Sequence, residues 1–312
     1  MTARAHETIE RIRAALESVI RGKSAVIESV LVGLVAGGHV LIEDVPGVGK
    51  TTLAKALARC CDVQCVRVQL TPDLLPSDIV GSSVLDPRDG TFSFRKGPIF
   101  SQVLLADELN RASPRTQSAL LEAMNEGQVT VDGQSYPLPR PFIVLATQNP
   151  GEHQGTFPLP EAQLDRFLLR VGLGYPSPED ELALVLARRR ADPLDLLEPI
   201  TDKDEVLAIQ SLARDVLVKE PVARYMLRIV TATRAHKDLS LGVSPRGMIA
   251  LFRASQALAF VRGRDYVSPD DVQTLALSVL AHRVQLSPQA RYGGASAEAI
   301  ITEVLRSVDV PL

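Results

Sequence analysis

A glycine-rich loop near the start of the chain has the residue types needed to hold a phosphate group. In the stretch LIEDVPGVGKTTLAKALA, Gly47 and Gly49 allow the tight backbone path that turns successive N–H groups toward an anion. Lys50 can neutralise the β- and γ-phosphates of a nucleotide, and Thr51 offers a hydroxyl ligand to Mg²⁺. We therefore expect the loop to contact a nucleotide through Pro46, Gly47, Val48, Gly49, Lys50, Thr51 and Thr52.

The loop departs at one position from the pattern G-x-x-x-x-G-K-[ST], because Asp44 stands where the first glycine is expected. That position lies where the preceding strand turns into the loop, and it faces the phosphates least. The apolar run HVLIE predicts a buried strand before the loop, and KTTLAKALARCC predicts a helix after it, whose positive end meets the anion. Because strand, loop and helix follow in this order, we predict a working nucleotide site despite Asp44.

Two acidic residues and an asparagine follow later apolar runs, each where a buried strand is expected to end. VLLADE contains Asp107 and Glu108, and LATQNP contains Asn149. An acidic pair alone can simply open a helix, and an Asn before a Pro is an ordinary turn residue. Beside a phosphate loop, Asp107 is the expected Mg²⁺ partner and Glu108 the base that deprotonates a water. Asn149 is then placed to hydrogen-bond the γ-phosphate and that water.

Two arginines are candidates for the cation that stabilises charge on a transferred phosphoryl group. Arg166 in EAQLDRF lies just before the last apolar run, and Arg246 in GVSPRG lies at a predicted helix start. An isolated arginine is usually a solvated surface residue. These two matter because the loop, the acidic pair and the asparagine leave such a cation unsupplied.

Apolar strand-like runs alternate with helical patterns through the first part of the chain. The runs are HVLIE and residues 63–69, 102–107, 142–147 and 167–173. Helices or long connections separate them, which is typical of a mostly parallel α/β sheet. The best-marked helix begins with Ser113 and Pro114 and ends at Gly127. Such a sheet can bring the loop and the acidic pair together.

Two hairpins and a change in pattern divide the chain further. The segments at about 77–98 and 127–140 each have an Asp-Gly turn between β-rich arms. Beyond Tyr175 the pattern is helical, with no further strand-like run. We expect an α/β core over residues 1–175, a helical linker over 176–220 and an all-helical lid domain over 221–312.

The composition weakens several classes of function. A formal charge of −3 and a pI near 6.0 give no global attraction to nucleic acid or to anionic membranes. The most apolar run, residues 30–42, is too short to span a membrane, and the charged amino terminus is unlike a secretory signal. We therefore expect no membrane insertion and a cytoplasmic location. Cys60, Cys61 and Cys65 have no fourth metal ligand nearby and are expected to be reduced thiols without an assigned role.

Taken in order, these motifs resemble the MoxR group of AAA+ ATPases over nearly the whole chain. The matching stretches are VIRGK, EDVPGVGKT, LLADELNRASPRTQSALLEAM, ATQNP, EAQLDRF and SPRG. The resemblance implies a P-loop NTPase core of the AAA+ type, whose five strands take the order 5-1-4-3-2, followed by a helical lid. It also accounts for Asp44, since MoxR-like loops often lack the first glycine.

The same resemblance suggests roles for further residues. Arg166 looks like the finger that reaches the γ-phosphate in a neighbouring subunit, and Arg246 looks like the sensor that couples the lid to the nucleotide. Arg111 in LNRAS could also cross a subunit boundary, and the sequence does not rank it against Arg166. Residues 19–23 match the stretch that contacts adenine, which makes Gly22 a candidate. The two hairpins resemble the helix-2 insert and the pre-sensor-1 hairpin, which line the substrate face of the ring.

The resemblance implies that the protein is an enzyme, an ATPase that uses ATP and Mg²⁺. It also implies a homo-oligomeric ring, expected to be a hexamer, that remodels partner proteins in the manner of a chaperone. It further suggests partners that bear von Willebrand factor A domains, and tasks such as metal-centre insertion or complex maturation. The client protein, the pathway and the ring stoichiometry are not given by the sequence.

A nucleic-acid translocase is the main alternative, because replicative helicase rings share both hairpin inserts. The first hairpin has Arg88, Arg95 and Lys96 in or beside it. The second has acidic residues and no Lys or Arg before Arg140, which is unfavourable for following a phosphate backbone. A non-catalytic nucleotide-gated scaffold is a further hypothesis, but it would require other residues in place of Glu108 or Asn149, and both are present. We therefore expect no stable nucleic-acid partner.

Overall fold

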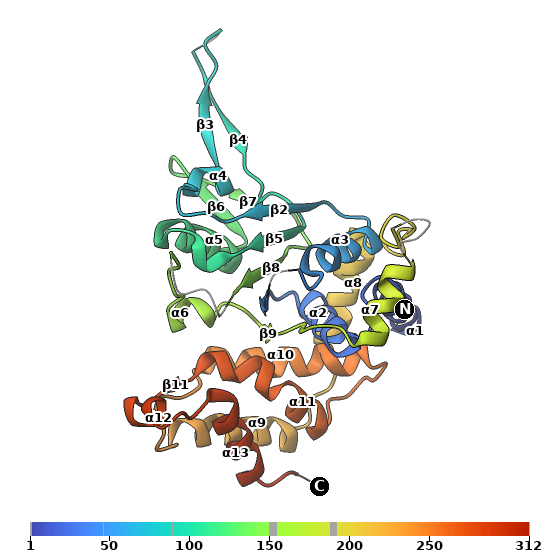
Figure 1. Ribbon diagram of the computed structural model, residues 1–312, viewed down its shortest axis with the longest axis vertical. Helices are drawn as coiled ribbons and strands as arrows, with labels where there is room; N and C mark the ends of the chain where they lie inside the picture. The colour runs from blue at the N-terminus through green and yellow to red at the C-terminus, as the bar shows by residue number, and fades with distance from the viewer. Residues whose placement is uncertain (1, 46, 89, 150–154, 188–191, 312) are drawn as a thin grey trace.

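The computed structural model describes residues 2–45, 47–88, 90–149, 155–187 and 192–311, with an α/β layer above a helical layer in Figure 1. The strands are β1 (Val40–Glu43), β2 (Cys65–Gln69), β3 (Gly81–Leu85), β4 (Phe92–Lys96), β5 (Val103–Asp107), β6 (Gln128–Val131), β7 (Gln134–Pro137), β8 (Ile143–Gln148), β9 (Leu169–Val171), β10 (Leu239–Leu241) and β11 (Gln285–Leu286). The α-helices are α1 (Thr2–Val19), α2 (Ser24–Ala36), α3 (Lys50–Cys60), α4 (Pro76–Val80), α5 (Pro114–Glu126), α6 (Glu161–Leu164), α7 (Pro178–Ala187), α8 (Lys203–Arg214), α9 (Glu220–Arg234), α10 (Pro245–Val261), α11 (Pro269–Leu280), α12 (Pro288–Tyr292) and α13 (Ala297–Ser307). Two short 3₁₀ helices are η1 (Leu109–Arg111) and η2 (Ala281–Arg283).

A five-stranded parallel sheet forms the centre of the α/β layer. Its order is β2-β5-β8-β1-β9, which confirms the predicted order 5-1-4-3-2 counted along these five strands. The neighbouring strands all pair in parallel, with Leu41 opposite Ala146 and Leu105 opposite Leu145. The carboxyl ends of β1, β5 and β8 therefore lie along one edge of the sheet.

Side chains alternate between the two faces of this sheet, and helices cover both faces. Leu41 and Leu104 point to the face that packs with α4 and α5. Ile42 and Leu105 point to the other face, which packs with α1, α2, α3 and helices of the lower layer. Because both faces are covered, the central strands read as continuous apolar runs rather than as alternating ones.

Two antiparallel hairpins leave the sheet layer within the expected ranges. β3 and β4 pair from Gly81 opposite Lys96 to Leu85 opposite Phe92 and extend upward in Figure 1. β6 and β7 pair beside the end of α5. Helix α5 has the predicted ends, since the Ser113 hydroxyl accepts a hydrogen bond from the Thr116 N–H at 3.3 Å and Gly127 caps the helix at a φ of 64°.

The lower layer is helical, as expected, but it also contains a short antiparallel pair. β10 and β11 have three and two residues, too few for a period-two pattern to appear in the sequence. The helices α12 and α13 were likewise not predicted. No helix in the described part of the chain has both the length and the apolar composition that a membrane crossing requires.

Burial accounts for the state of two of the three cysteines. It raises the pKa of the Cys60 thiol to about 11 and, together with the neighbouring Cys60, that of Cys61 to about 12. Both thiols are therefore protonated and unreactive at neutral pH. All three cysteines are free, as expected.

A buried arginine joins the two layers. Arg283, from η2, donates from Nε to Asp165 Oδ1 at 2.7 Å and from its Nη atoms to the carbonyl oxygens of Phe167 and Leu168 at 2.5 and 3.2 Å. Its side chain is 2% exposed. Burial lowers the pKa of Arg283, while the Asp165 carboxylate raises it. The guanidinium thus fixes the lid against the segment that leads into β9.

Replacing Arg283 with alanine is expected to lower the free energy of unfolding by about 3 kcal/mol, because Asp165 and two carbonyl oxygens lose their donors. Arg283→Lys should recover only part of the loss, since an ammonium group cannot reproduce the guanidinium fork. Urea unfolding of the full chain measures both changes. The exposed Arg291 is the control, and Arg291→Ala should stay within about 0.5 kcal/mol of the parent. We call the contacts of Arg283 with Asp165, Phe167 and Leu168 the Arg283 clamp. An Arg283→Ala protein as stable as the control would show that this clamp does not stabilise the fold.

Candidate active site

The glycine-rich loop adopts the backbone conformation that its sequence predicts. Gly47 and Gly49 have φ angles of 88° and 98°, in the region that favours glycine. A Cβ atom at Gly47 would meet nothing within 4 Å, so backbone conformation rather than crowding requires glycine there. Helix α3 begins at Lys50, and no side chain caps its first turn. The N–H groups of that turn are therefore available to an anion, together with the positive end of the helix.

Asp44 ties the loop to the neighbouring strand. Its Oδ1 accepts from the N–H of Val45 at 2.8 Å, and its Oδ2 accepts from the N–H of Gly174, beyond β9, at 2.5 Å. Its backbone carbonyl accepts from Lys50 Nζ at 3.0 Å. A glycine could make only the last of these contacts. The aspartate therefore connects the ends of β1 and β9, which explains why it stands at a position where many phosphate loops have glycine.

The Asp107 carboxylate, at the end of β5, is held on both oxygens. Thr147, at the end of β8, donates from its hydroxyl to Asp107 Oδ1 at 2.5 Å. Arg67, on β2, donates to Oδ2 from Nε at 3.1 Å and from Nη2 at 2.7 Å. The carboxylate is only 13% exposed, and these partners fix its orientation at the edge of the sheet.

Glu108 turns the chain sharply after Asp107. Its φ of 59° is unusual for a residue other than glycine and costs about 1 kcal/mol or more. Its N–H donates to the Thr147 hydroxyl at 2.9 Å, which helps to hold this conformation. Its carboxylate accepts from Arg111 Nη1 at 3.0 Å. The candidate base is therefore paired with a cation of its own chain.

A cavity of about 320 Å³ lies at this edge of the sheet and collects most of the predicted site residues. Its lining comprises Gly47, Gly49, Lys50, Thr51, Thr52, Arg67, Asp107, Glu108, Thr147 and Asn149. The loop, the acidic pair and the asparagine thus meet around one space, as their positions after parallel strands require. Arg67 and Thr147 complete the lining and were not predicted.

The chemistry of these side chains fits a magnesium ion bound with a nucleotide. Thr51 and Asp107 offer the oxygen ligands that Mg²⁺ prefers, and both border the cavity. Among the described residues no group of three or more His, Cys, Asp or Glu side chains forms a metal cage of its own. Mg²⁺ is usually held by one or two protein carboxylates and by substrate phosphates.

Four predicted residues lie outside the cavity lining. Val48 is partly buried against the core. Gly22 has a φ of 70°, and a Cβ there would lie 2.0 Å from Asp180 Oδ2, so the start of α7 packs closely on this turn. Arg166 and Arg246 form no part of the lining either. Pro46 lies outside the described residues.

Arg166 and Arg246 lie close to the Arg283 clamp. Arg166 follows Asp165 directly, and its Nε is buried without a hydrogen-bond partner among the described residues. Arg246 is exposed in the first turn of α10, where its charge lowers the pKa of Arg283 in addition to burial. The Ser244 hydroxyl, which caps α10, donates to Asp165 Oδ2 at 3.4 Å. Both arginines therefore belong to the region around Asp165.

The sequence contained signals for the two missed residues. Arg67 is a charge inside an otherwise apolar run, and β2 pairs with β5, so its side chain can reach Asp107. Thr147 is a hydroxyl at the end of an apolar run, where it satisfies both members of the acidic pair. Neither was distinguishable from an ordinary strand residue before the strand order was known.

Comparisons with known proteins agree with this geometry. The model of the ATPase family associated with various cellular activities (AAA) matches residues 39–169, and a model of the AAA lid domain matches residues 231–304. The chain is 48% identical to the protein YeaC of Bacillus subtilis, over 95% of this chain and 93% of that one. It is 41% identical to chaperone MoxR1 of Mycobacterium tuberculosis, over 97% and 82%, and 34% identical to protein MoxR of Paracoccus denitrificans, over 91% and 90%. A crystal structure from Cytophaga hutchinsonii, described as a candidate ATPase, superposes with a TM-score of 0.92 at 38% identity and covers 100% of this chain and 97% of that one.

Replacing Asp44 with glycine, which restores the common loop pattern, is expected to weaken nucleotide binding rather than improve it. The change removes two side-chain hydrogen bonds, so the free energy of unfolding should fall by about 2 kcal/mol and the loop should lose its fixed position. Calorimetric titration with a non-hydrolysable ATP analogue and urea unfolding measure the two effects. Asp44→Asn keeps one acceptor oxygen and should fall between the two proteins. Tighter binding by Asp44→Gly would contradict the assigned role.

Proposed function

The chain belongs to the MoxR family of AAA+ ATPases, and from this membership we propose that it hydrolyses ATP with Mg²⁺ to remodel partner proteins as a ring of identical subunits. It is a chaperone-like ATPase that binds nucleotide, as its family is. One observation carries the finer proposal. The loop, the acidic pair and Asn149 line a single cavity of about 320 Å³.

The proposed binding roles follow from the positions of the loop residues. Lys50 moves from the Asp44 carbonyl to the β- and γ-phosphates, and the N–H groups of the loop bind the phosphate oxygens. Thr51 and Asp107 would hold Mg²⁺, which when bound neutralises charge on the phosphates. Arg67, whose side chain is 48% exposed, would share the Asp107 carboxylate with the ion.

The proposed catalytic roles belong to Glu108 and Asn149. Glu108 accepts the proton of the attacking water, and the Asn149 amide positions that water against the γ-phosphate. Arg111 holds the Glu108 carboxylate within the same chain, so this contact must open or shift before the carboxylate can reach the water. We therefore assign Arg111 to the control of Glu108 and not to the neighbouring subunit.

Arg166 and Arg246 are proposed to serve the nucleotide of the next subunit. Neither lines the cavity of its own chain, and both lie beside Asp165 at the junction between the core and the lid. A ring would bring this junction to the neighbour's γ-phosphate, where two cations stabilise the transferred charge. The expected sensor role of Arg246 is thus retained, but for a neighbour.

The hairpin β3–β4 supports a protein client over a nucleic-acid one. Its outer part exposes Phe92 at 73%, with Leu85 and Val84 close to half exposed. Apolar side chains suit contact with a partly unfolded or flexible protein. This hairpin also has exposed cations, but the second hairpin, β6–β7, has no Lys or Arg for contact with a phosphate backbone. We propose further that the ring is a hexamer and that it is located in the cytoplasm. Its partners would carry von Willebrand factor A domains, and its task would be metal-centre insertion or complex maturation.

Glu108→Gln is expected to bind ATP at close to the parent affinity and to hydrolyse it at least about 100-fold more slowly, because the amide cannot accept the proton of the water. Single-turnover hydrolysis and equilibrium binding of labelled ATP separate the two properties. Gln69 accepts a hydrogen bond from Arg67 but is not part of the cavity lining, so Gln69→Ala serves as the control. Normal turnover by Glu108→Gln would remove this residue as the base.

Mixing two inactive variants tests whether Arg166 acts between subunits. Arg166→Ala alone should lose about 10³-fold in rate. When it is mixed with Glu108→Gln, a site can combine Glu108 of one subunit with Arg166 of the next, so activity should rise well above the sum of the two proteins. Arg111→Ala mixed with Glu108→Gln should show no such gain, because both residues act in one chain. Absence of rescue in the first mixture, with ring assembly verified by light scattering, would place Arg166 within its own site.

A further inference from the structure

A second and larger cavity lies at the opposite edge of the central sheet. Its volume is about 690 Å³, and its lining comes from the ends of α2 and α5, the segment between β7 and β8, and the helices α8 and α10. His39 precedes β1 and Phe142 precedes β8, whereas the nucleotide cavity follows both strands. The two cavities are therefore separated by the length of these strands, and neither shares a residue with the other.

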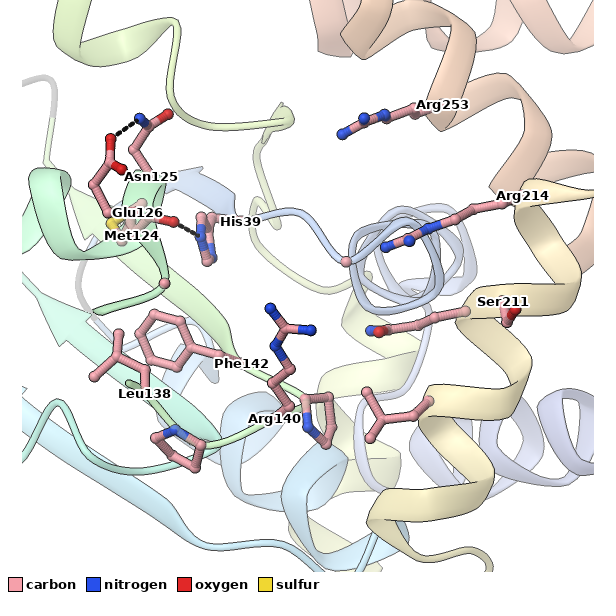
Figure 2. Close-up of a pocket in the computed structure, with 16 residues that line it drawn as sticks. His39, Met124, Asn125, Glu126, Leu138, Arg140, Phe142, Ser211, Arg214 and Arg253 are labelled. Carbon is pink, nitrogen blue, oxygen red and sulfur yellow. Dashed lines mark hydrogen bonds between the residues drawn. The ribbon is translucent and has the colours of Figure 1, made fainter. Parts of the chain in front are cut away.

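Three arginines from three separate segments extend into this cavity. Figure 2 shows Arg140 before β8, Arg214 at the end of α8 and Arg253 on α10 directed toward the same hollow. All three side chains are exposed. Within the described ranges, none of them makes an ion pair or a side-chain hydrogen bond. Glu126 is the only acidic side chain in the lining, and its Oε1 accepts from Asn125 Nδ2 at 2.9 Å.

The polar groups on the floor of this cavity, which we call the arginine cavity, already have hydrogen-bond partners other than the arginines. His39 uses both ring nitrogens, since Nδ1 accepts from the N–H of Val144 at 3.0 Å and Nε2 lies 3.1 Å from the carbonyl of Met124. This pattern fixes the neutral ring with its proton on Nε2, and burial lowers the pKa of His39 to about 4. Gln210 donates to the carbonyl of Leu34 at 2.7 Å.

These contacts answer the simplest alternative, in which the arginines only neutralise the negative ends of helices. The carbonyl groups of Met124 and Leu34, near the ends of α5 and α2, have His39 and Gln210 as donors. Arg140 and Arg253 lie on neither helix, whereas Arg214 lies in the last turn of α8, where its charge also interacts favourably with the carboxyl end of that helix. The arrangement thus leaves three exposed guanidinium groups around one hollow without protein acceptors among the described residues, so their donors are available to an anionic partner that enters.

We propose that this arginine cavity binds an acidic segment of a partner protein, one with at least two carboxylates and an apolar side chain between them. The guanidinium groups would each take a carboxylate in a bidentate manner. Leu138, Phe142 and Leu207 offer an apolar wall that a phosphate group or a nucleic-acid backbone cannot use. The adjacent Glu126, and the hairpin β6–β7 without Lys or Arg, disfavour a polyphosphate chain.

The proposal goes beyond ATP hydrolysis and does not depend on it. A protein that cannot hydrolyse ATP should still bind the acidic segment, because the two cavities have no residue in common. Docking at this edge would instead hold a partner close to the hairpin β6–β7, whose base borders the cavity at Gly127 and Leu138.

The test selects short random peptides displayed on phage against the full chain, in parallel with the variant Arg140→Gln/Arg214→Gln/Arg253→Gln. Selected peptides should be enriched in Asp and Glu flanking an apolar residue. A fluorescent copy of the best peptide should bind roughly tenfold more weakly for each arginine removed, and its binding should weaken with added salt. Arg291→Gln, on the exposed arginine of α12, is the matched control and should bind like the parent. Circular dichroism and nucleotide binding verify that the triple variant is folded.

Three outcomes would overturn the proposal. They are a selection with no enrichment of carboxylates, selected peptides that bind the triple variant as well as the parent, and displacement of the peptide by tripolyphosphate or single-stranded DNA at lower concentration than by a peptide of the same charge. The last result would assign the cavity to a phosphate ligand. If Glu108→Gln loses ATP hydrolysis but binds the peptide as the parent does, peptide binding is independent of the proposed ATPase activity, and each proposal can fail without the other.

Discussion

The parallel pairing of β1, β5 and β8 is the constraint on which the rest of the structure depends. It places Asp107, Thr147 and the phosphate loop at one edge, although they come from distant parts of the sequence. The Thr147 hydroxyl then joins the acidic pair, since it donates to Asp107 and accepts from the N–H of Glu108. A slip of one residue in β8 would turn this hydroxyl to the other face of the sheet and separate it from both carboxyl residues.

Asp44 shows how a departure from a common pattern becomes part of the fold. A glycine at this position contributes only backbone freedom, but the φ angles that require glycine are at Gly47 and Gly49. The aspartate instead gains two N–H donors, one of them from beyond β9. β9 is an edge strand of three residues with a single neighbour, so a side-chain contact at its end adds to a short hydrogen-bond ladder. The loop and the edge of the sheet are therefore fixed together.

The residues that follow each strand could be predicted because buried parallel strands and the loop pattern have strong local signals, whereas the strand order came only from the resemblance to a known family. The sequence was not sufficient for β10 and β11, which are too short to show a period, nor for Arg67, whose role depends on the side-by-side pairing of β2 and β5. It could not rank Arg111 against Arg166. Arg111 lies three residues from Glu108 on a turn that begins with a left-handed residue, and only the coordinates show that this turn directs Arg111 to the Glu108 carboxylate.

The arginines near the site have different partners within one chain. Within one chain the carboxylates at the edge are already compensated, Glu108 by Arg111 and Asp107 by Arg67. Arg166, in contrast, has a buried Nε without an acceptor in the described part of the chain, and it adjoins the Arg283 clamp that fixes the lid. A buried donor without an acceptor is costly, so the packing around Arg166 is unfavourable in the single chain. In the proposed ring, a change in this packing would free the guanidinium to reach a neighbouring site, so that assembly and hydrolysis would be linked through the same side chain.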